Sequence, residues 1–362
     1  MRVLALAVLL AGCGGAASAP AGDLDAALDA VSRGDLDEAE KMVRSAQGHE
    51  PARYHARILM MRNRNREAID RLVPLLQGRL KDYDAMERRQ LVYPDLALAY
   101  VRQDNFMSAA RLYAQLGESV LAKKCEALSK VVAYSSELPD NEVAVEFHVT
   151  DPLPIVAGTV NGRRALFVVD TLLDEVVLDR QFARAAGVES FAKEMTLGRA
   201  VVRNVPLQLG EAAPIGTLRP DGAIGLQFLM HFDFTLDYKR SRLVLRKAGG
   251  TIPGQPAYLV GDRYLLTQGL VNGKDRAFVG IGTSLKGVTL AVSDLALQAL
   301  GGEVREFAAG PIKLVRPALD PKGFPMGLEG QFGVPVGFVL GHAALRGRVL
   351  RLEPRSMKLA IE

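Results

Sequence analysis

The sequence has few of the residues on which disulfide, metal and nucleic-acid chemistry depend. Among its 362 residues are two cysteines, five histidines and no tryptophan, and aromatic residues make up 6%. Two cysteines cannot build a disulfide framework or a cysteine-rich metal site, and no two histidines have the spacing of a motif such as HExxH. Charge is nearly balanced, with 45 Lys and Arg against 41 Asp and Glu, and no dense basic stripe predicts a nucleic-acid partner. We therefore expect no metal, no cofactor and no nucleic acid, and either cofactor-free chemistry or binding.

A short apolar run near the start of the chain ends in a cysteine. Residues 3–11 are apolar and lead through a glycine into Cys13. Nine apolar residues are too few to span a bilayer as a helix, but they fit the hydrophobic region of a secretory signal. The sequence Leu-Ala-Gly-Cys resembles a bacterial lipobox, which implies a signal peptide at 1–12 and a lipid on Cys13. This predicts a lipid-anchored protein of the bacterial cell envelope, with Gly14 favouring the outer membrane; an ordinary signal with an incidental cysteine is the alternative.

The next third of the chain has a helical period. After a linker at 13–22, apolar residues recur at helical spacing over 23–135. Cys125 lies on such a pattern, so we expect a buried, unreactive thiol. Three turns with Gly, Asn or Asp each precede a small residue in the next helix, namely Ala39, Ala68 and Ala109. The pattern resembles tetratricopeptide repeats, which implies a protein partner on a concave face. An irregular helical bundle acting as a spacer is the alternative.

From about Val143 the pattern changes to short β-rich runs, and it then repeats. We predict two similar β-lobes, at 140–248 and 251–362. Each contains two runs joined by Asn-Gly, a dipeptide that favours a tight hairpin because both residues tolerate positive φ. Each also has an apolar strand after that turn, an apolar-apolar-Gly element further on, and a closing pair of β-runs. Two copies of this length are hard to obtain by chance.

The first copy resembles one lobe of the retropepsin-like aspartic peptidases. The resemblance rests on an Asn-Gly hairpin leading into Asp170-Thr171, a strand at 175–178 with a helix at 179–186, and the later element Ala223-Ile224-Gly225. In that family the apolar-Gly strand threads past the catalytic turn, and the helix after it closes the lobe. The resemblance implies a bilobal, pepsin-like arrangement, a polypeptide substrate, and Asp170 and Thr171 as catalytic residues.

The chemistry of this family needs two carboxylates that share one proton. Such a pair cannot ionise fully, so one member activates water and the other supports the oxyanion. Here Leu172 stands where the family has Gly, and the second copy reads Gly282-Thr283-Ser284, with no carboxylate at the matching position. Nearby acids do not align with the missing partner: Asp174, Asp275 and Asp294. Enzymatic activity is therefore uncertain, and its loss is favoured.

These observations lead to three functional hypotheses for a multidomain α + β protein, in which tetratricopeptide-like helices precede two mostly-β acid-protease-like lobes. The first is an envelope lipoprotein whose degenerate peptidase domain binds extended polypeptide. The second is an active aspartic endopeptidase that uses Asp170. The third is an envelope scaffold whose cleft is filled by Leu172, Leu173 and neighbouring apolar residues. His342 follows the second apolar-Gly element, and we expect it at the surface.

Overall fold

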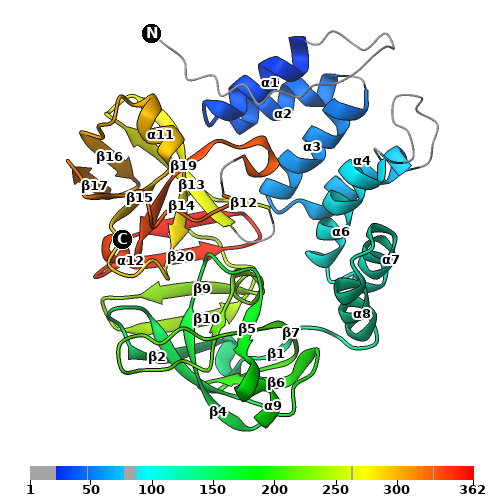
Figure 1. The fold of residues 1–362 in the computed structure, drawn as a ribbon, viewed down its shortest axis with the longest axis vertical. Helices are drawn as coiled ribbons and strands as arrows, with labels where there is room; N and C mark the ends of the chain where they lie inside the picture. The colour runs from blue at the N-terminus through cyan, green and yellow to red at the C-terminus, as the bar shows by residue number, and fades with distance from the viewer. Residues whose placement is uncertain (1–21, 47, 77–85, 87, 262–263, 329) are drawn as a thin grey trace.

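The computed structural model describes residues 22–46, 48–76, 86, 88–261, 264–328 and 330–362. Cys13, the predicted signal peptide 1–12 and most of the linker 13–22 lie outside the described residues. The fold is mixed α + β, with helices in the N-terminal third and mainly strands in the remainder (Figure 1).

The helices form a chain of sequential neighbours. Each packs against the next along the sequence, and Asp35 and Asn105 start two of them by accepting hydrogen bonds from Glu38 N and Ser108 N. The three corner alanines are fully buried, which lets adjacent helices approach closely, and Cys125 is buried as expected. A repeat of the tetratricopeptide type stays a prediction. The elements are α1 (Gly22–Ser32), α2 (Leu36–Ser45), α3 (His49–Met61), α4 (Asn65–Leu76), η1 (Arg88–Val92), α6 (Tyr93–Val101), α7 (Phe106–Leu116) and α8 (Ser119–Leu128).

The first β-lobe is built on the predicted hairpin. Asn161 and Gly162 have φ of 49° and 82°, as a tight turn requires, and they join β3 to β4. Strand β8 lies parallel to β4 and antiparallel to β5, so it threads between them. The elements are β1 (Ser135–Glu137), η2 (Pro139–Asn141), β2 (Glu142–Val149), β3 (Ile155–Val160), β4 (Arg163–Val169), β5 (Val176–Asp179), α9 (Arg180–Ala185), β6 (Phe191–Leu197), β7 (Ala200–Gly210), β8 (Gly222–Ile224), α10 (Leu226–Leu229), β9 (Phe232–Asp237) and β10 (Arg242–Lys247).

The second β-lobe repeats this arrangement. Strand β19 lies parallel to β14 and antiparallel to β15, as β8 does between β4 and β5. The sequence repeat therefore becomes a structural repeat. The elements are β11 (Gln255–Pro256), β12 (Tyr258–Val260), β13 (Tyr264–Val271), β14 (Asp275–Gly282), β15 (Leu290–Val292), α11 (Asp294–Ala299), β16 (Glu306–Ala309), β17 (Ile312–Val315), β18 (Leu319–Asp320), η3 (Gln331–Gly333), β19 (Val336–Gly341), α12 (His342–Leu345), β20 (Val349–Glu353) and β21 (Lys358–Ile361).

A shared sheet joins the two lobes. β9 pairs antiparallel with β20, which gives the strand order β2-β10-β9-β20-β21-β11 across the boundary. One apolar core runs through both lobes, with Phe234 and Leu352 on facing strands both almost fully buried. Backbone pairing and core packing therefore hold the lobes together.

The helical array packs against both lobes. Tyr54 of α3 and Phe332 of the second lobe belong to one apolar cluster, and the Arg57 guanidinium lies 5.5 Å from the centre of the Phe332 ring. At the other end, Lys124 of α8 forms a mostly buried ion pair with Glu175 of the first lobe. Figure 1 shows the array running along one side of the lobes. The helices are thus part of the folded body.

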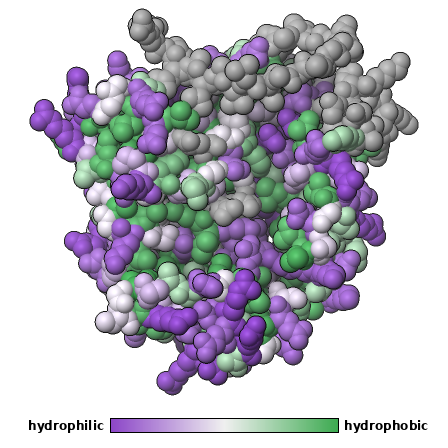
Figure 2. Space-filling view, viewed as in Figure 1, coloured by the Kyte–Doolittle hydropathy of each residue, from purple (hydrophilic) through white to green (hydrophobic). Residues whose placement is uncertain are grey.

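The surface seen in Figure 2 mixes polar and apolar side chains, and hydrophilic residues dominate its lower end, which the first lobe forms. Among the described residues, no helix combines the length and the apolar character needed to cross a bilayer.

Candidate functional site

Two equivalent turns meet at the centre of the β-lobes. The first follows β4, where Asp170 N donates to Ile224 O at 3.0 Å and Leu173 N closes the turn on Asp170 O at 3.4 Å. The second follows β14, where Leu285 N closes the turn on Gly282 O at 3.3 Å. Asp170 and Gly282 therefore occupy the same place in the two lobes, as the sequence repeat predicts.

Two buried threonines lock these turns to each other. Thr171 N donates to Thr283 Oγ1 at 3.0 Å, and Thr283 N donates to Thr171 Oγ1 at 3.2 Å. Each hydroxyl also donates to a carbonyl of the opposite lobe, Thr171 to Ile281 O at 2.6 Å and Thr283 to Val169 O at 2.7 Å. Neither threonine is exposed. The exchange fixes the position of Asp170 relative to Gly282.

The Asp170 carboxylate has a hydroxyl partner from the other lobe. Ser284 Oγ donates to Asp170 Oδ1 at 2.6 Å, and Leu172 N donates to the same oxygen at 2.8 Å. Burial raises the pKa of Asp170, and the two hydrogen bonds act against that rise. No second carboxylate among the described residues forms a hydrogen bond with it, so it has no group with which to share a proton.

Apolar side chains crowd Gly282, which is the counterpart of Asp170 in the second lobe. A Cβ built on Gly282 would lie 2.9 Å from Leu285 Cδ1 and 3.0 Å from Leu172 Cδ1. Both leucines are partly buried against the apolar cluster that the helices share with the second lobe. An aspartate at this position would need both to move, because a Cβ contact under about 3.4 Å is already tight.

The other acids considered from the sequence lie at different positions in the two lobes. Asp275 is exposed at the far end of β14, and Asp294 is exposed at the start of α11. Asp174 is half-buried, and its backbone carbonyl accepts from Gln227 N at 2.8 Å. Nor do His, Cys, Asp or Glu side chains within the described ranges gather in a group of three or more that could hold a metal ion.

Two glycines let the apolar-Gly strands pass close to these turns. A Cβ on Gly225 would lie 2.1 Å from Glu175 O, and a Cβ on Gly341 would lie 2.2 Å from Val288 O. Each glycine directly precedes a short helix, and the two have nearly identical backbone angles: φ is −88° and ψ 177° at Gly225, and φ is −87° and ψ 176° at Gly341. No larger residue fits either place without moving the backbone.

Sequence reasoning missed the role of Ser284. The signal was present, because the repeat aligns Ser284 with Leu172, the two residues that follow the threonines. In the structure each reaches across to the first residue of the opposite turn, Ser284 to Asp170 and Leu172 to Gly282. The two turns are thus linked by one polar pair and one apolar pair.

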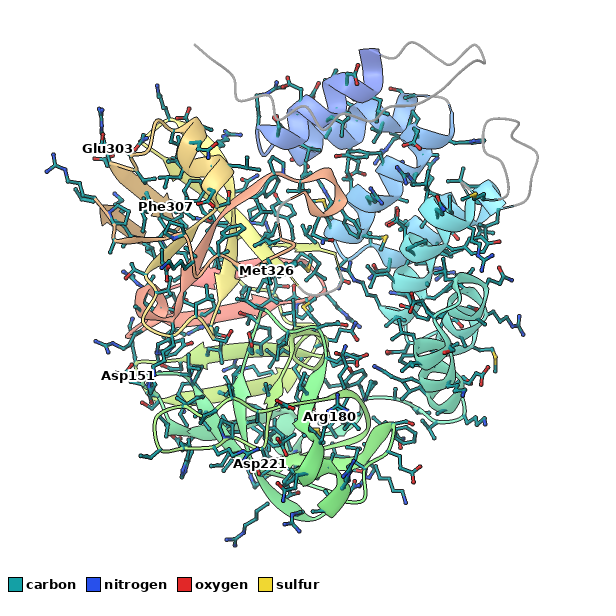
Figure 3. All side chains as sticks on the ribbon, viewed as in Figure 1. Asp151, Arg180, Asp221, Glu303, Phe307 and Met326 are labelled. Carbon is teal, nitrogen blue, oxygen red and sulfur yellow. The ribbon has the colours of Figure 1, made fainter. Side chains whose placement is uncertain are left out.

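His342 is a correction to the sequence analysis. We expected it at the surface, but it is 2% exposed at the start of α12. The ring meets Tyr238 edge-on at 5.4 Å between centroids, and its Nε2 lies 3.8 Å from an Asp151 carboxylate oxygen. Asp151 sits at the boundary of the lobes in Figure 3 and also pairs with Arg346 at 2.9 Å. Burial lowers the pKa of His342. Its position was hidden because the lobe boundary forms only in the folded protein.

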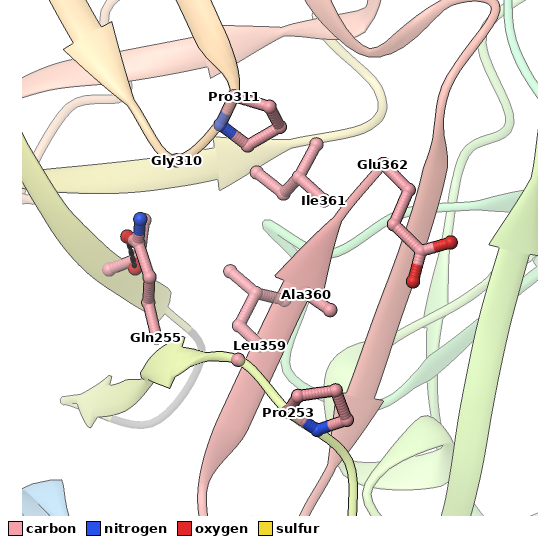
Figure 4. A pocket seen from close by; sticks show the side chains of 10 residues that line it. Pro253, Gln255, Gly310, Pro311, Leu359, Ala360, Ile361 and Glu362 are labelled. Atoms are coloured by element: carbon pink, nitrogen blue, oxygen red, sulfur yellow. Dashed lines mark hydrogen bonds between the residues drawn. The ribbon is translucent and has the colours of Figure 1, made fainter.

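A pocket of about 230 Å³ lies elsewhere, between β11, β21 and the turn joining β16 to β17 (Figure 4). Gln255, Pro311 and Ile361 help to line it, and Asp170 does not. This pocket is therefore distinct from the central turns.

No family model matches the chain, and no curated protein matches it. Among solved structures, the chain is similar to the crystal structure of a retropepsin-like aspartic protease from Rickettsia conorii, at 19% identity and a TM-score of 0.24, over 32% of this chain and 97% of that one. The strand order and the paired turns show by themselves that the two lobes are copies of one β-arrangement.

Proposed function

We propose that this protein is a non-hydrolytic, aspartic-peptidase-like lipoprotein of the bacterial cell envelope that binds extended polypeptide. One observation supports the proposed lack of hydrolysis: Gly282 has no carboxylate at the position equivalent to Asp170, and Leu172 and Leu285 pack against it. A lone Asp170, with its pKa raised by burial and bonded to Ser284, lacks the partner that divides the acid and base roles.

The proposed ligand follows from the frame that is retained. The threonine exchange and the two threaded strands keep the central turns in a defined geometry although the dyad is gone. Asp170, Leu172 and Ser284 are each half-buried, so each keeps a minor part of its surface exposed at the central turns. Two similar lobes that meet at paired turns suit an extended chain that lies across both. An alternative partner surface is the helical array, whose packing against both lobes suits a scaffold role.

The lipid anchor rests on the sequence around Cys13 alone. Cleavage after residue 12 and acylation of Cys13 would tether the folded body through the linker at 13–22. The measurement is incorporation of a labelled fatty acid in the producing bacterium, beside Cys13→Ser. Label in the wild type and none in the variant supports the anchor; label in neither, or in both, contradicts it.

Hydrolysis is tested on the full chain purified in detergent. We expect no cleavage of an unfolded protein mixture from acid to neutral pH, with no difference between wild type and Asp170→Asn. Cleavage by the wild type that the variant lacks would overturn the proposal. Both proteins should have the far-ultraviolet circular dichroism of a folded chain, so that inactivity is not read from unfolded material.

Binding is tested separately from hydrolysis. Cross-linking of an unfolded protein to residues near the central turns, through a photoreactive group at Leu172, should succeed if extended polypeptide binds there. A matched group at exposed Met326 serves as the control for non-specific capture. Equal capture at both positions would leave the scaffold hypothesis in place of the binding one.

A further inference from the structure

The two outer strands of the inter-lobe sheet are covered to different extents. In the first lobe, β2 covers β10 over five residue pairs, from Arg242–Glu146 to Arg246–Glu142. In the second lobe, β11 covers the corresponding strand β21 over two pairs, Lys358–Pro256 and Leu359–Gln255. The strands correspond because Arg242 and Lys358 pair with Asp237 and Glu353, the last residues of β9 and β20.

In the part of the chain that the structure describes, three residues at the end of the second lobe therefore have no paired strand on their outer side. Ala360, Ile361 and Glu362 correspond to Val244, Leu245 and Arg246, all of which face β2. Within the described ranges, no strand is registered on their outer side.

Local chemistry explains why the chain leaves this edge. Continuing the register of β11 would place Pro253 opposite Ile361, and proline has no N–H to donate to a ladder. A Cβ on Gly254 would lie 2.6 Å from Leu359 O, so the chain crosses close to the β21 backbone there and glycine is required. Pro253 and Gly254 thus prevent the pairing from beginning before Gln255.

The backbone groups of Ile361 point toward the uncovered side. Glu362 and Val349 exchange both hydrogen bonds at 2.9 Å, so the polar groups of Glu362 face β20. In an antiparallel ladder the direction alternates along the strand. Met357 O accepts from Ala257 N at 2.8 Å, so the polar groups of Met357 point to the outer side of the sheet. Ile361 is four residues further along and points the same way, so it presents one N–H and one C=O to an incoming strand.

A pocket lies directly beside this edge. The side chains of Leu359 and Ile361 face the same space as Gln255 and Pro311 in Figure 4, and the volume is about 230 Å³. A cavity of roughly 150 Å³ can hold a benzene molecule, so this pocket has room for one apolar side chain. In the first lobe the equivalent place is taken by Val143, which is buried opposite Leu245.

Charge at the edge is reversed between the lobes. In the first lobe Arg246 Nε pairs with Glu142 Oε2 of β2 at 2.5 Å. The corresponding residue of the second lobe is Glu362, whose side chain is half-exposed and meets Arg351 at 3.5 Å. A strand bound in the place that corresponds to β2 would therefore match the charge of Glu362 if it carried a basic residue where β2 has Glu142.

We propose that the outer edge of β21 binds an extended segment of a partner polypeptide by antiparallel strand addition. The segment carries Lys or Arg opposite Glu362, followed by an apolar residue opposite Ile361 that enters the pocket. The occupant takes the position that β2 holds in the first lobe. This site is separate from the central turns, so it stands or falls independently of the proposed function.

The test uses the full chain in detergent and a fluorescent peptide, Thr-Val-Thr-Arg-Val-Ala, read by anisotropy. We expect saturable binding that weakens at least tenfold with Glu362→Lys and is restored when the peptide carries Glu in place of Arg. N-methylation of the peptide valine, which faces Ile361, should abolish binding, whereas N-methylation of the alanine after it should not. The matched control is Glu303→Lys, an exposed reversal in the same lobe with a pair to Arg305.

Several results would overturn the proposal. These are no binding to the wild type, equal weakening by Glu303→Lys and Glu362→Lys, or indifference to N-methylation of the valine. Self-association of the chain that Glu362→Lys abolishes would assign the edge to a second copy instead. Thermal unfolding of both variants checks that each is folded, so a loss of binding reports on the edge.

Discussion

The two central turns have the same backbone but opposite chemistry. Each ends a strand, closes on itself and gives a threonine to the other lobe. The first presents a carboxylate, and the second presents a hydrogen atom at Gly282, with Leu172 and Leu285 packed against it. The comparison shows that the geometry of this centre depends on threonine and glycine, because the two turns share it although only one of them carries a carboxylate.

The largest effect should come from the glycines that let the threaded strands pass. Gly225→Ala and Gly341→Ala each place a Cβ about 2 Å from a backbone oxygen, so each should lower the free energy of unfolding by about 3 kcal/mol or more. Urea unfolding measures it. The control Gly347→Ala has open space but φ of 74° and should cost only about 1–2 kcal/mol. If only one of the two variants lowered the free energy of unfolding by this much, the two glycines would not have equivalent roles.

The threonine exchange should be the next most sensitive. Thr171→Val or Thr283→Val leaves a buried N–H and a buried carbonyl without a partner, at a cost of about 2–4 kcal/mol each. Because the two share their hydrogen bonds, the double variant should cost less than the sum. Unfolding of the full double-mutant cycle measures this coupling. Thr267→Val, also buried but bonded elsewhere, should add to Thr171→Val; strict additivity of the first pair would contradict the exchange.

A carboxylate without its partner should cost stability at neutral pH. The pKa of Asp170 is raised above 3.8, so the unfolded chain loses its proton first as pH rises, and stability falls until the folded pKa is passed. Asp170→Asn removes the charge but keeps a side-chain oxygen that can accept the hydrogen bonds from Ser284 Oγ and Leu172 N. It should gain about 1 kcal/mol at pH 7, and the gain should vanish near pH 3.8. Unfolding at both pH values measures it, with Ser284→Ala, which should destabilise, as the opposite control; a loss at pH 7 would contradict the raised pKa.

The smallest difference concerns the residue that follows the threaded strand, Leu226 in one lobe and His342 in the other. Burial lowers the pKa of His342 below 6.5, so the unfolded chain binds a proton first as pH falls, and stability is lost below about pH 6.5. His342→Leu should reduce this loss by about 1 kcal/mol between pH 7 and pH 5. The thermal midpoint at the two pH values measures it. An unchanged pH dependence would exclude His342 as its source.

Local sequence signals determined much of the fold. The Asn-Gly hairpins, the corners between helices and the change of hydrophobic period all depend on residues adjacent in sequence, so they could be predicted. The internal repeat also predicted that Asp170 and Gly282 occupy equivalent positions.

Contacts between distant segments were decided only by the tertiary structure. Ser284 donates to Asp170, Leu172 packs against Gly282, and His342 is buried against Tyr238 at the lobe boundary. The two residues of each pair are far apart in the sequence. The same holds for the uncovered edge of β21, because strand pairing depends on which chain lies alongside. Short-range patterns fix period and turns through local sterics and hydrogen bonds, whereas burial and partners depend on the relative placement of two lobes and a helical array.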